Sequence, residues 1–184
     1  MRVIAGEKKG QRLKTPKGDR IRPTEDRIKE NVFNLLYGPF SGAKVLDLFS
    51  GTGHMGIEFL SRGANFAWFC DNHRESIGIT RENISITGYN ENSKVVAGSF
   101  EACLDLARIE NVTFDYIYVD PPYANRDFYD RTASIVGVDH LLAPGGRMVF
   151  ESPIDYDFSD YEHFKLVRQK AYGKKIIWIY ESCD

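Results

Sequence analysis

The hydrophobic pattern of the chain changes period repeatedly after residue 43. Short apolar runs, which are typical of buried strands, alternate with segments whose apolar residues recur every three or four positions, as on one face of a helix. We expect strands at Val45–Leu48, Asn65–Cys70, Lys94–Ala97, Tyr116–Val119, Arg147–Glu151, His163–Gln169 and Lys175–Glu181. We expect helices at Met55–Ser61, Arg74–Thr87, Phe100–Ile109 and Asp127–Val136. This alternation predicts a three-layer α/β fold built on a mostly parallel sheet.

The C-terminal part of the chain departs from this alternation. No helical pattern separates the last two expected strands, so we expect them to form an antiparallel hairpin that adds one reversed strand at the edge of the sheet. Pro144-Gly145-Gly146 predicts a turn ahead of the fifth strand.

Residues 1–38 predict a small extension ahead of a main domain at residues 39–184. Val3–Ala5 and Arg12–Lys14 flank a loop bounded by glycines, which favours a β-hairpin. Thr24 is a suitable cap for a helix that runs to about Tyr37, where Gly38-Pro39 would end it.

Composition places the chain among ordinary globular proteins, because 42% of its 184 residues are hydrophobic and 27% are charged. No apolar run approaches the ~18 residues of a membrane span, and the N-terminus lacks the apolar core of a secretory signal. Cys70, Cys103 and Cys183 are odd in number and widely spaced, which is typical of reduced thiols and not of a zinc site. We therefore expect a cytoplasmic protein without a metal.

The net charge of -2 conceals a basic N-terminus. Residues 1–22 carry eight Lys or Arg and two acids, a sum of +6, so the remainder carries about -8. A basic arm on an acidic body suits a phosphate backbone, although a solvated terminus explains the charge equally well. The candidate RNA-binding residues are Lys8, Lys9, Arg12, Lys14, Arg22 and Arg27. For the last two, ion pairs with neighbouring acids are the alternative.

Asp120-Pro121-Pro122-Tyr123, which follows the apolar run Phe114–Val119, is the most informative motif. Proline lacks an N–H and has a fixed φ, so the segment cannot continue a sheet ladder. A carboxylate, a carbonyl and an aromatic ring at a strand end suit a planar group that bears NH₂, because the ring offers a stacking face and the oxygen atoms accept both N–H bonds. The motif resembles the signature of methyltransferases that act on exocyclic amino nitrogens of nucleic-acid bases, and this resemblance implies that Asp120, Pro121, Pro122 and Tyr123 are catalytic residues.

A glycine loop follows the first expected strand. Gly51, Gly53 and Gly56 satisfy G-x-G-x-x-G, which taken alone is also the fingerprint of nicotinamide-dependent enzymes. Asp47 turns the interpretation toward S-adenosylmethionine, because a carboxylate at the strand end repels a pyrophosphate but can bind the ammonium of a methionine moiety. The predicted cofactor-binding residues here are Asp47, Phe49, Ser50, Gly51, Thr52 and Gly53.

The next two strand ends complete the predicted cofactor site. Asp71 and Asn72 follow the second strand, where an acid can accept hydrogen bonds from a ribose diol, although Asp71 is also placed to cap the following helix. Ser99 and Phe100 follow the third strand, where they can meet the edge and the face of adenine. For Phe100 alone, simple burial in the core is the commoner role.

With these motifs placed, nearly the whole chain resembles the small-subunit ribosomal RNA guanine-N2 methyltransferases of the RsmD type. The segments that resemble the N-terminal signature of that family are Arg2–Gly6, Gly10–Leu13 and Arg22–Arg27, with Glu30 and Phe33. Asp47–Gly53 and Asp120–Tyr123 resemble its cofactor and catalytic motifs. Other amino-methylating enzymes share the catalytic tetrapeptide, so the tetrapeptide alone does not distinguish this family from them. The N-terminal segments narrow the assignment to this family.

The resemblance implies a Rossmann-like class I methyltransferase fold, S-adenosylmethionine as cofactor, and a guanine of 16S ribosomal RNA as substrate, within a small-subunit particle or an assembly intermediate. We expect a monomer. Ser99 and Asp71 depart from the family, which usually has an acid at the first position and often a glutamate at the second. A hydroxyl can replace one hydrogen bond to the adenine amine, so we expect weaker cofactor binding and not its loss.

Three other functions stay open at this point. A methyltransferase of adenine N6 or cytosine N4 would share the catalytic tetrapeptide, although DNA-modifying enzymes usually need an added recognition region that this chain is too short to hold. A nicotinamide-dependent oxidoreductase would use the glycine loop. A non-catalytic RNA-binding assembly factor would keep the fold and the basic arm.

Overall fold

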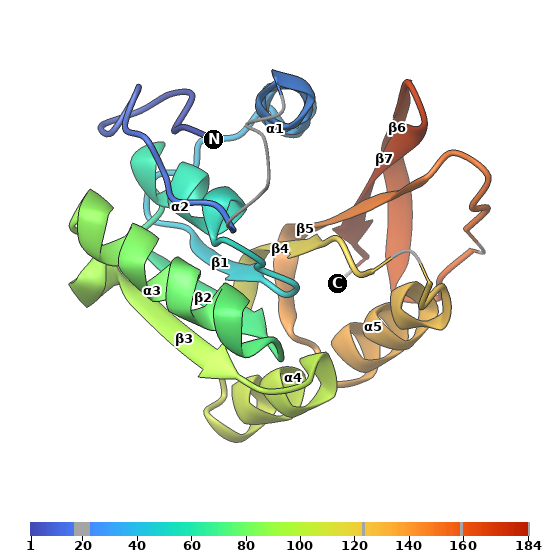
Figure 1. Cartoon of the computed structure of the whole chain (residues 1–184). Helices are drawn as coiled ribbons and strands as arrows, with labels where there is room; N and C mark the ends of the chain where they lie inside the picture. Colours follow the sequence, from blue (N-terminus) through green and yellow to red (C-terminus); the bar gives the residue numbers. More distant parts are fainter. Residues whose placement is uncertain (17–22, 123, 159, 184) are drawn as a thin grey trace.

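The structure is a computed structural model that describes residues 1–16, 23–122, 124–158 and 160–183. Within these residues, seven strands form one sheet in the order β3-β2-β1-β4-β5-β7-β6 (Figure 1). The strands are β1 (Lys44–Asp47), β2 (Phe66–Asp71), β3 (Ser93–Ala97), β4 (Phe114–Val119), β5 (Leu142–Pro153), β6 (Phe164–Tyr172) and β7 (Lys175–Ser182). Strands β1 to β5 pair in parallel, which confirms the predicted fold class.

Helices cover both faces of this sheet. In the described part of the chain they are α1 (Pro23–Leu36), α2 (His54–Ser61), α3 (Arg74–Thr87), α4 (Phe100–Ile109) and α5 (Asp127–Val138), with a short 3₁₀ turn at Asn90–Asn92. Helices α1, α2 and α3 share one buried cluster on one face, and α4 and α5 share the other (Figure 1). None of the helices described here is both long and apolar enough to cross a membrane.

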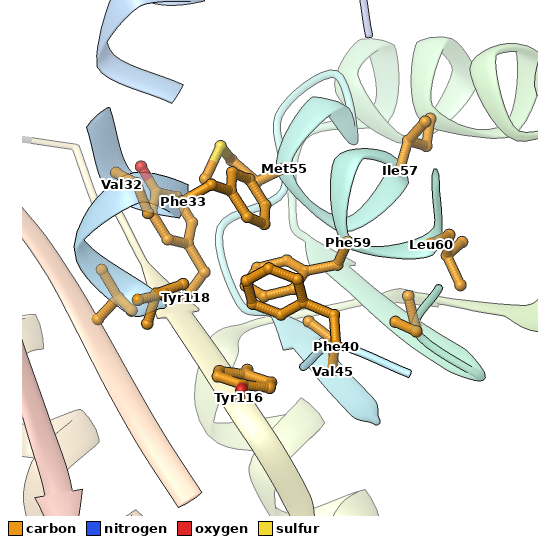
Figure 2. Close-up of a cluster of buried hydrophobic side chains, with 14 of the residues drawn as sticks. Val32, Phe33, Phe40, Val45, Met55, Ile57, Phe59, Leu60, Tyr116 and Tyr118 are labelled. Atoms are coloured by element: carbon orange, nitrogen blue, oxygen red, sulfur yellow. The ribbon is translucent and has the colours of Figure 1, made fainter. Parts of the chain in front are cut away.

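Aromatic side chains hold α1 and α2 against the sheet. The ring of Phe59 in α2 lies 4.6 Å from that of Phe33 in α1, and 5.4 Å from those of Phe40 and Tyr116 (Figure 2). Edge-to-face contacts of this kind add to the stabilisation that burial provides. The helix of the predicted N-terminal extension is therefore packed into the core of the main domain.

The predicted antiparallel C-terminal hairpin lies at an edge of the sheet, but the reversed strand is the inner strand of this hairpin and not the edge strand. Strand β7 lies between β5 and β6 and is antiparallel to both, so β6 is the edge strand. The side chains of β7 explain this order, because Ile177–Tyr180 are all buried whereas most of β6 is exposed. An apolar strand gains from neighbours on both sides, and a polar strand tolerates the edge.

The turn predicted at Pro144-Gly145-Gly146 is wrong. These residues form an irregular bulge inside β5, where pairing moves from Phe114↔Leu142 to Tyr116↔Arg147. Gly145 has a φ of 69°, which allows the chain to leave the ladder and return to it.

The N-terminal hairpin is smaller than predicted. A single bridge joins Arg2 and Arg12, because the N–H groups of Ile4 and Ala5 bind the carboxylate of Glu58, at 2.8 and 2.9 Å, and not a partner strand. Helix α1 begins at Pro23, one residue before the predicted cap at Thr24, since the fixed φ of proline suits the first helical position.

Candidate active site

A cleft of about 540 Å³ opens at the carboxyl ends of the parallel strands. Its walls come from the segments that follow β1 to β4, with contributions from α1, β5 and the first residue of β7. Strand β1 has β2 on one side and β4 on the other, so the direction of the chain across the sheet reverses here. Ligands of open α/β sheets bind at such a reversal.

The glycine loop after β1 forms one wall. Gly51 and Gly53 have φ values of 54° and 76°, which residues with a Cβ rarely adopt. A Cβ on Gly53 would lie 2.9 Å from Cγ2 of Thr80, whereas a Cβ on Gly51 would meet no atom within 4 Å. Gly51 borders the cleft, so its missing side chain leaves room for a ligand. The neighbouring cleft residues that were predicted are Phe49, Ser50 and Thr52.

Asp47 lies beneath this loop and not among the residues that line the cleft. Its buried carboxylate accepts the N–H of Gly56 at 2.9 Å, which ties β1 to the first turn of α2. Burial raises the pKa of Asp47 to about 7, the bond from Gly56 opposes this, and the charge of Asp71 adds to it. The structure thus gives Asp47 a role in holding the loop, and its contact with a methionine ammonium stays a prediction.

Asp71, at the end of β2, connects the loop to the segment before α3. Its two oxygens accept the N–H groups of Gly51, at 2.8 Å, and of His73, at 2.7 Å. Asp71 lines the cleft, and its contact with a ribose stays a prediction. The capping role weighed for Asp71 is wrong, because His73 is the N-cap residue of α3 and Asp71 binds the N–H of His73 itself. Asn72 lines the cleft beside it.

Three aromatic rings line the cleft and contact one another. The ring of Phe100 lies 5.5 Å from that of Phe49 and 4.8 Å from that of Phe128, and all three residues line the cleft. Ser99 caps α4, because its hydroxyl oxygen accepts the N–H of Ala102 at 3.3 Å. The sequence interpretation missed Phe128, which lies in α5 without a motif to mark it.

The proline motif enters the same cleft from β4. Asp120, Pro121 and Pro122 all line it. Strands β1 and β4 are paired neighbours, with Asp47 opposite Tyr118, so the glycine loop and this motif start from adjacent strand ends. Tyr123, the predicted stacking residue, lies outside the described residues.

Three cleft residues near this motif were not predicted. The hydroxyl of Tyr118 donates to one oxygen of Glu151 and the ammonium of Lys175 donates to the other. Burial and the charges of Glu151 and Asp120 raise the pKa of Tyr118 well above its usual value, so this hydroxyl keeps its proton. A sequence signal existed, because Glu151 ends an otherwise apolar strand and a buried carboxylate needs a partner.

One member of a buried ion pair, Lys29, also lines the cleft. Nζ of Lys29 lies 3.3 Å from Oε2 of Glu58, and the two side chains are 1% and 0% exposed. Lys29 also donates to the carbonyl of Arg2 at 2.6 Å, and burial lowers its pKa while Glu58 opposes that shift. The sequence contained a signal for this ion pair, because Glu58 is an acid inside the apolar helix α2.

His54 lines the cleft, and its imidazole has no carboxylate or cysteine partner among the described residues. Burial lowers its pKa to about 3, and the charges of Lys29 and Lys175 act in the same direction. The imidazole is therefore neutral near pH 7, and its Nδ1 lies 3.4 Å from Oγ1 of Thr52. Across the described residues, no three His, Cys, Asp or Glu side chains are grouped as metal ligands.

The predicted RNA-binding residues lie on the N-terminal segment and on α1. Lys8 pairs with Glu7 at 2.7 Å and Lys14 pairs with Glu82 at 2.6 Å. The others that the structure describes are exposed and have no acidic partner within the described ranges; they are Lys9, Arg12 and Arg27. Arg22 lies outside the described residues. Thr15 and Pro16 line the cleft, so the basic segment leads to it.

The sheet order, the reversed β7 and the glycine loop at the end of β1 define a class I methyltransferase fold. The chain matches the family model "Conserved hypothetical protein 95" over residues 1–181, and it belongs to that family. It is 31% identical over 183 residues to "Putative rRNA methyltransferase YlbH" of Bacillus subtilis, with 99% of each chain covered.

Two further proteins extend the comparison. The chain is 27% identical to "Ribosomal RNA small subunit methyltransferase D" of Haemophilus influenzae, over 99% of this chain and 94% of that protein. The solved structure of "Putative methyltransferase yhhF" from Escherichia coli superposes with a TM-score of 0.84 at 27% identity, over 99% and 97% of the two chains. The resemblance inferred from the sequence motifs is confirmed.

Proposed function

We propose that this protein transfers a methyl group from S-adenosylmethionine to the N2 amino group of a guanine in 16S ribosomal RNA. The observation that carries the proposal is the shared cleft, which the glycine loop after β1 and the proline motif after β4 line together. The names of the relatives support ribosomal RNA as the substrate. A nicotinamide-dependent reaction would leave Asp120-Pro121-Pro122 without a role.

The cleft suits S-adenosylmethionine in size and in chemistry. Its volume falls within the ~300–1,000 Å³ that ligand sites usually have. Asp71 and Asn72 would bind the ribose, and Ser99 and Phe100 the adenine. The glycine loop, supported by Asp47, would bind the methionine moiety. When bound, the cofactor supplies a methyl group that its positive sulfur has already activated.

The protein must orient a weak nucleophile, because the lone pair of the guanine amine is delocalised into the ring. Asp120 and the carbonyl of Pro121 would accept the two amine protons and hold the nitrogen toward the methyl group. These acceptors also stabilise the positive charge that develops on nitrogen, and Asp120 can accept the proton that leaves. Tyr123 would stack on the base, a contact worth ~1–3 kcal/mol. The guanine must be unpaired or flipped out of a helix.

The basic N-terminal segment would guide RNA to this cleft. Lys9, Arg12 and Arg27 are exposed and free to meet phosphates, and Thr15 and Pro16 continue the segment to the cleft wall. We propose that residues 1–38 form the RNA-contacting part and residues 39–184 the catalytic part. We further propose that the protein acts as a monomer on a small-subunit particle in the cytoplasm.

The test is methyl transfer by the purified protein to small-subunit particles and to naked 16S RNA from cells that lack it. Mass spectrometry of the nucleosides should show N2-methylguanosine. Replacing Asp120 by Ala should lower turnover at least a hundredfold, because it removes an acceptor aimed at developing charge. Calorimetry should show that Asp120→Ala binds S-adenosylmethionine with an affinity within about twofold of that of the original protein.

Asp115→Ala is a matched control. Asp115 lies on the same strand at the end away from the cleft, where it accepts the N–H of Lys44 at 2.7 Å. This variant should keep near-normal turnover. Undiminished turnover in Asp120→Ala would contradict the assigned roles, and methylation of DNA oligonucleotides without methylation of RNA would contradict the substrate.

A further inference from the structure

The β6–β7 hairpin concentrates positive charge in a chain whose net charge is negative. Residues 163–175 contain five Lys or Arg and no acid, whereas the whole chain sums to -2. The five are Lys165, Arg168, Lys170, Lys174 and Lys175. Lys175 pairs with Glu151, but the other four have no acidic partner within the described residues. Their charge is therefore available to a ligand.

The register of the hairpin aligns part of this charge on one face. Arg168 lies opposite Ile179, Lys170 opposite Ile177, and Tyr172 opposite Lys175. Side chains two residues apart on a strand point to the same face, about 7 Å from one another. Ile177 and Ile179 belong to the buried cluster beneath α1 and α2, so this row lies on the α1 side of the sheet.

The row runs from the end of α1 to the cleft. At one end, Nη1 of Arg168 donates to the carbonyl of Leu35 at 3.1 Å, and its guanidinium lies 4.6 Å from the ring centre of Tyr37. At the other end, Lys175 lines the cleft. Figure 1 shows α1 between the N-terminal segment and the β6–β7 hairpin, which forms one end of the sheet.

One aromatic ring lies beside this row and another lies in it. Tyr37 is 75% exposed beside Arg168, and Nζ of Lys170 lies 5.5 Å from the ring centre of Tyr172. Cations next to an exposed ring suit single-stranded RNA, because cations neutralise the phosphates and the ring accepts a stacked base. A solvated charged face would not need an exposed ring.

We infer that the β6–β7 hairpin is a second RNA-binding surface, which holds single-stranded RNA next to the target base on the side of the cleft away from the N-terminal segment. This inference rests on the proposed function for the identity of its ligand. Arg168, Lys170 and Lys174 bind phosphates, and Tyr37 offers a stacking face for a base. The hairpin and the N-terminal segment thus contact RNA from two sides of one cleft.

The competing explanation is protection of an edge strand. Lysines on an exposed edge prevent pairing with a second copy of the chain, and β6 is such an edge. The two explanations predict different losses. If the cations only protect the edge, their removal should promote self-association and leave RNA affinity unchanged.

The experiment compares two double variants that each remove two exposed, unpaired cations. Lys170→Gln/Lys174→Gln removes two of the five positive charges of the hairpin. Lys44→Gln/Arg81→Gln, at the start of β1 and on α3, removes the same charge elsewhere. Fluorescence anisotropy with a labelled single-stranded fragment of 16S RNA, over a series of salt concentrations, measures RNA binding. Steady-state methylation gives KM for RNA and kcat, calorimetry gives cofactor affinity, and sedimentation gives the oligomeric state.

The hairpin variant should bind RNA at least fivefold more weakly, and its salt slope should fall by about 0.7 for each phosphate contact that is lost. KM for RNA should rise similarly, while kcat and cofactor affinity stay within twofold. The control variant should remain within twofold of the original protein throughout. Equal losses in both variants, or self-association of the hairpin variant with unchanged RNA affinity, would overturn the inference.

The experiment distinguishes failure of the proposed function from failure of the hairpin inference. If the unmodified protein methylates no RNA, the proposed reaction is wrong, but anisotropy still decides whether the hairpin binds RNA. If the unmodified protein methylates RNA and the hairpin variant has the same KM and salt slope, only the hairpin inference is wrong.

Discussion

Burial of a single side chain beneath the cleft can shift its pKa, and Asp47 is the clearest case. Its carboxylate is buried behind the glycine loop with a hydrogen bond from Gly56, and burial raises its pKa to about 7. Position in the sequence suggested a direct ligand, because the residue ends β1 just before the loop. The structure places its side chain on the inner side of that loop.

This burial predicts a pH dependence of stability. Asp47 loses its proton near pH 3.8 when the chain is unfolded and near pH 7 when it is folded. The stability that its protonated form contributes is therefore complete below about pH 4 and is lost as the pH rises through 7. Asn cannot ionise, so Asp47→Asn does not lose this stability. As the pH rises across this range, the unfolding free energy of Asp47→Asn should therefore increase relative to that of the original protein, by at most about 4 kcal/mol.

Urea unfolding of both proteins at pH 4.5, 6 and 7.5 measures this difference. Asp105→Asn, at an exposed position in α4, is the control and should show little pH-dependent gain. A difference between Asp47→Asn and the original protein that stays constant with pH would show that Asp47 is ionised in the folded protein throughout.

At the level of elements, one buried carboxylate fastens three segments together. Glu58 of α2 accepts the N–H groups of Ile4 and Ala5, pairs with Lys29 of α1 and binds Nε of Arg62 at 2.9 Å. The N-terminal segment lacks a full strand ladder, so these bonds replace the missing pairing. An acid inside an apolar helix is stable here because every partner is a donor or a cation.

Glu58→Gln should therefore release the N-terminal segment. The change leaves the ammonium of Lys29 buried without its counter-charge and puts an NH₂ near backbone donors, so we expect a loss of about 3–5 kcal/mol in unfolding free energy. Hydrogen exchange at the amides of Ile4 and Ala5 should accelerate at least tenfold. Glu110→Gln, which breaks the more exposed pair with Lys94, should cost no more than about 1 kcal/mol. Unchanged exchange at the two amides would contradict this role for Glu58.

At the level of the whole molecule, the N-terminal extension and the main domain share one core. Val3 and Leu13 are buried in the same cluster as Val32 of α1 and Phe59 of α2 (Figure 2 shows the last two). The proposed RNA-contacting part and the proposed catalytic part are therefore not separate folding units. The cleft itself depends on this arrangement, because Met1, Thr15 and Lys29 help to line it.

We therefore expect a single cooperative unfolding transition, with equal calorimetric and van't Hoff enthalpies. Removal of residues 1–16 should lower the unfolding free energy by about 4.5–9 kcal/mol, since it removes three buried apolar side chains, those of Met1, Val3 and Leu13, at ~1.5–3 kcal/mol each. Scanning calorimetry of both chains measures this. Two separate transitions in the full chain, or an unchanged Tm after truncation, would show that the extension folds independently.

The sequence predicted most elements closely, because hydrophobic period and helix-ending glycines are local properties. Helix α4 begins and ends where it was expected, and α3 does too. The errors came from partners distant in the sequence. The Pro144–Gly146 bulge depends on where β4 resumes pairing, and the N-terminal hairpin was limited by a carboxylate 54 residues away.

By itself, the sequence determined the fold class, the glycine loop and the presence of the Asp-Pro-Pro-Tyr motif at the end of β4, because each is written in consecutive residues whose backbone geometry and chemistry are local. Only the tertiary structure decided that β7 lies inside the sheet, that Lys29 and Glu58 meet, and that Glu151 binds both Tyr118 and Lys175. These outcomes depend on which distant groups can satisfy a buried charge or cover an apolar strand. The pairing of such groups is decided only when the elements pack. Burial makes an unpaired charge costly, and its partner can lie anywhere in the chain.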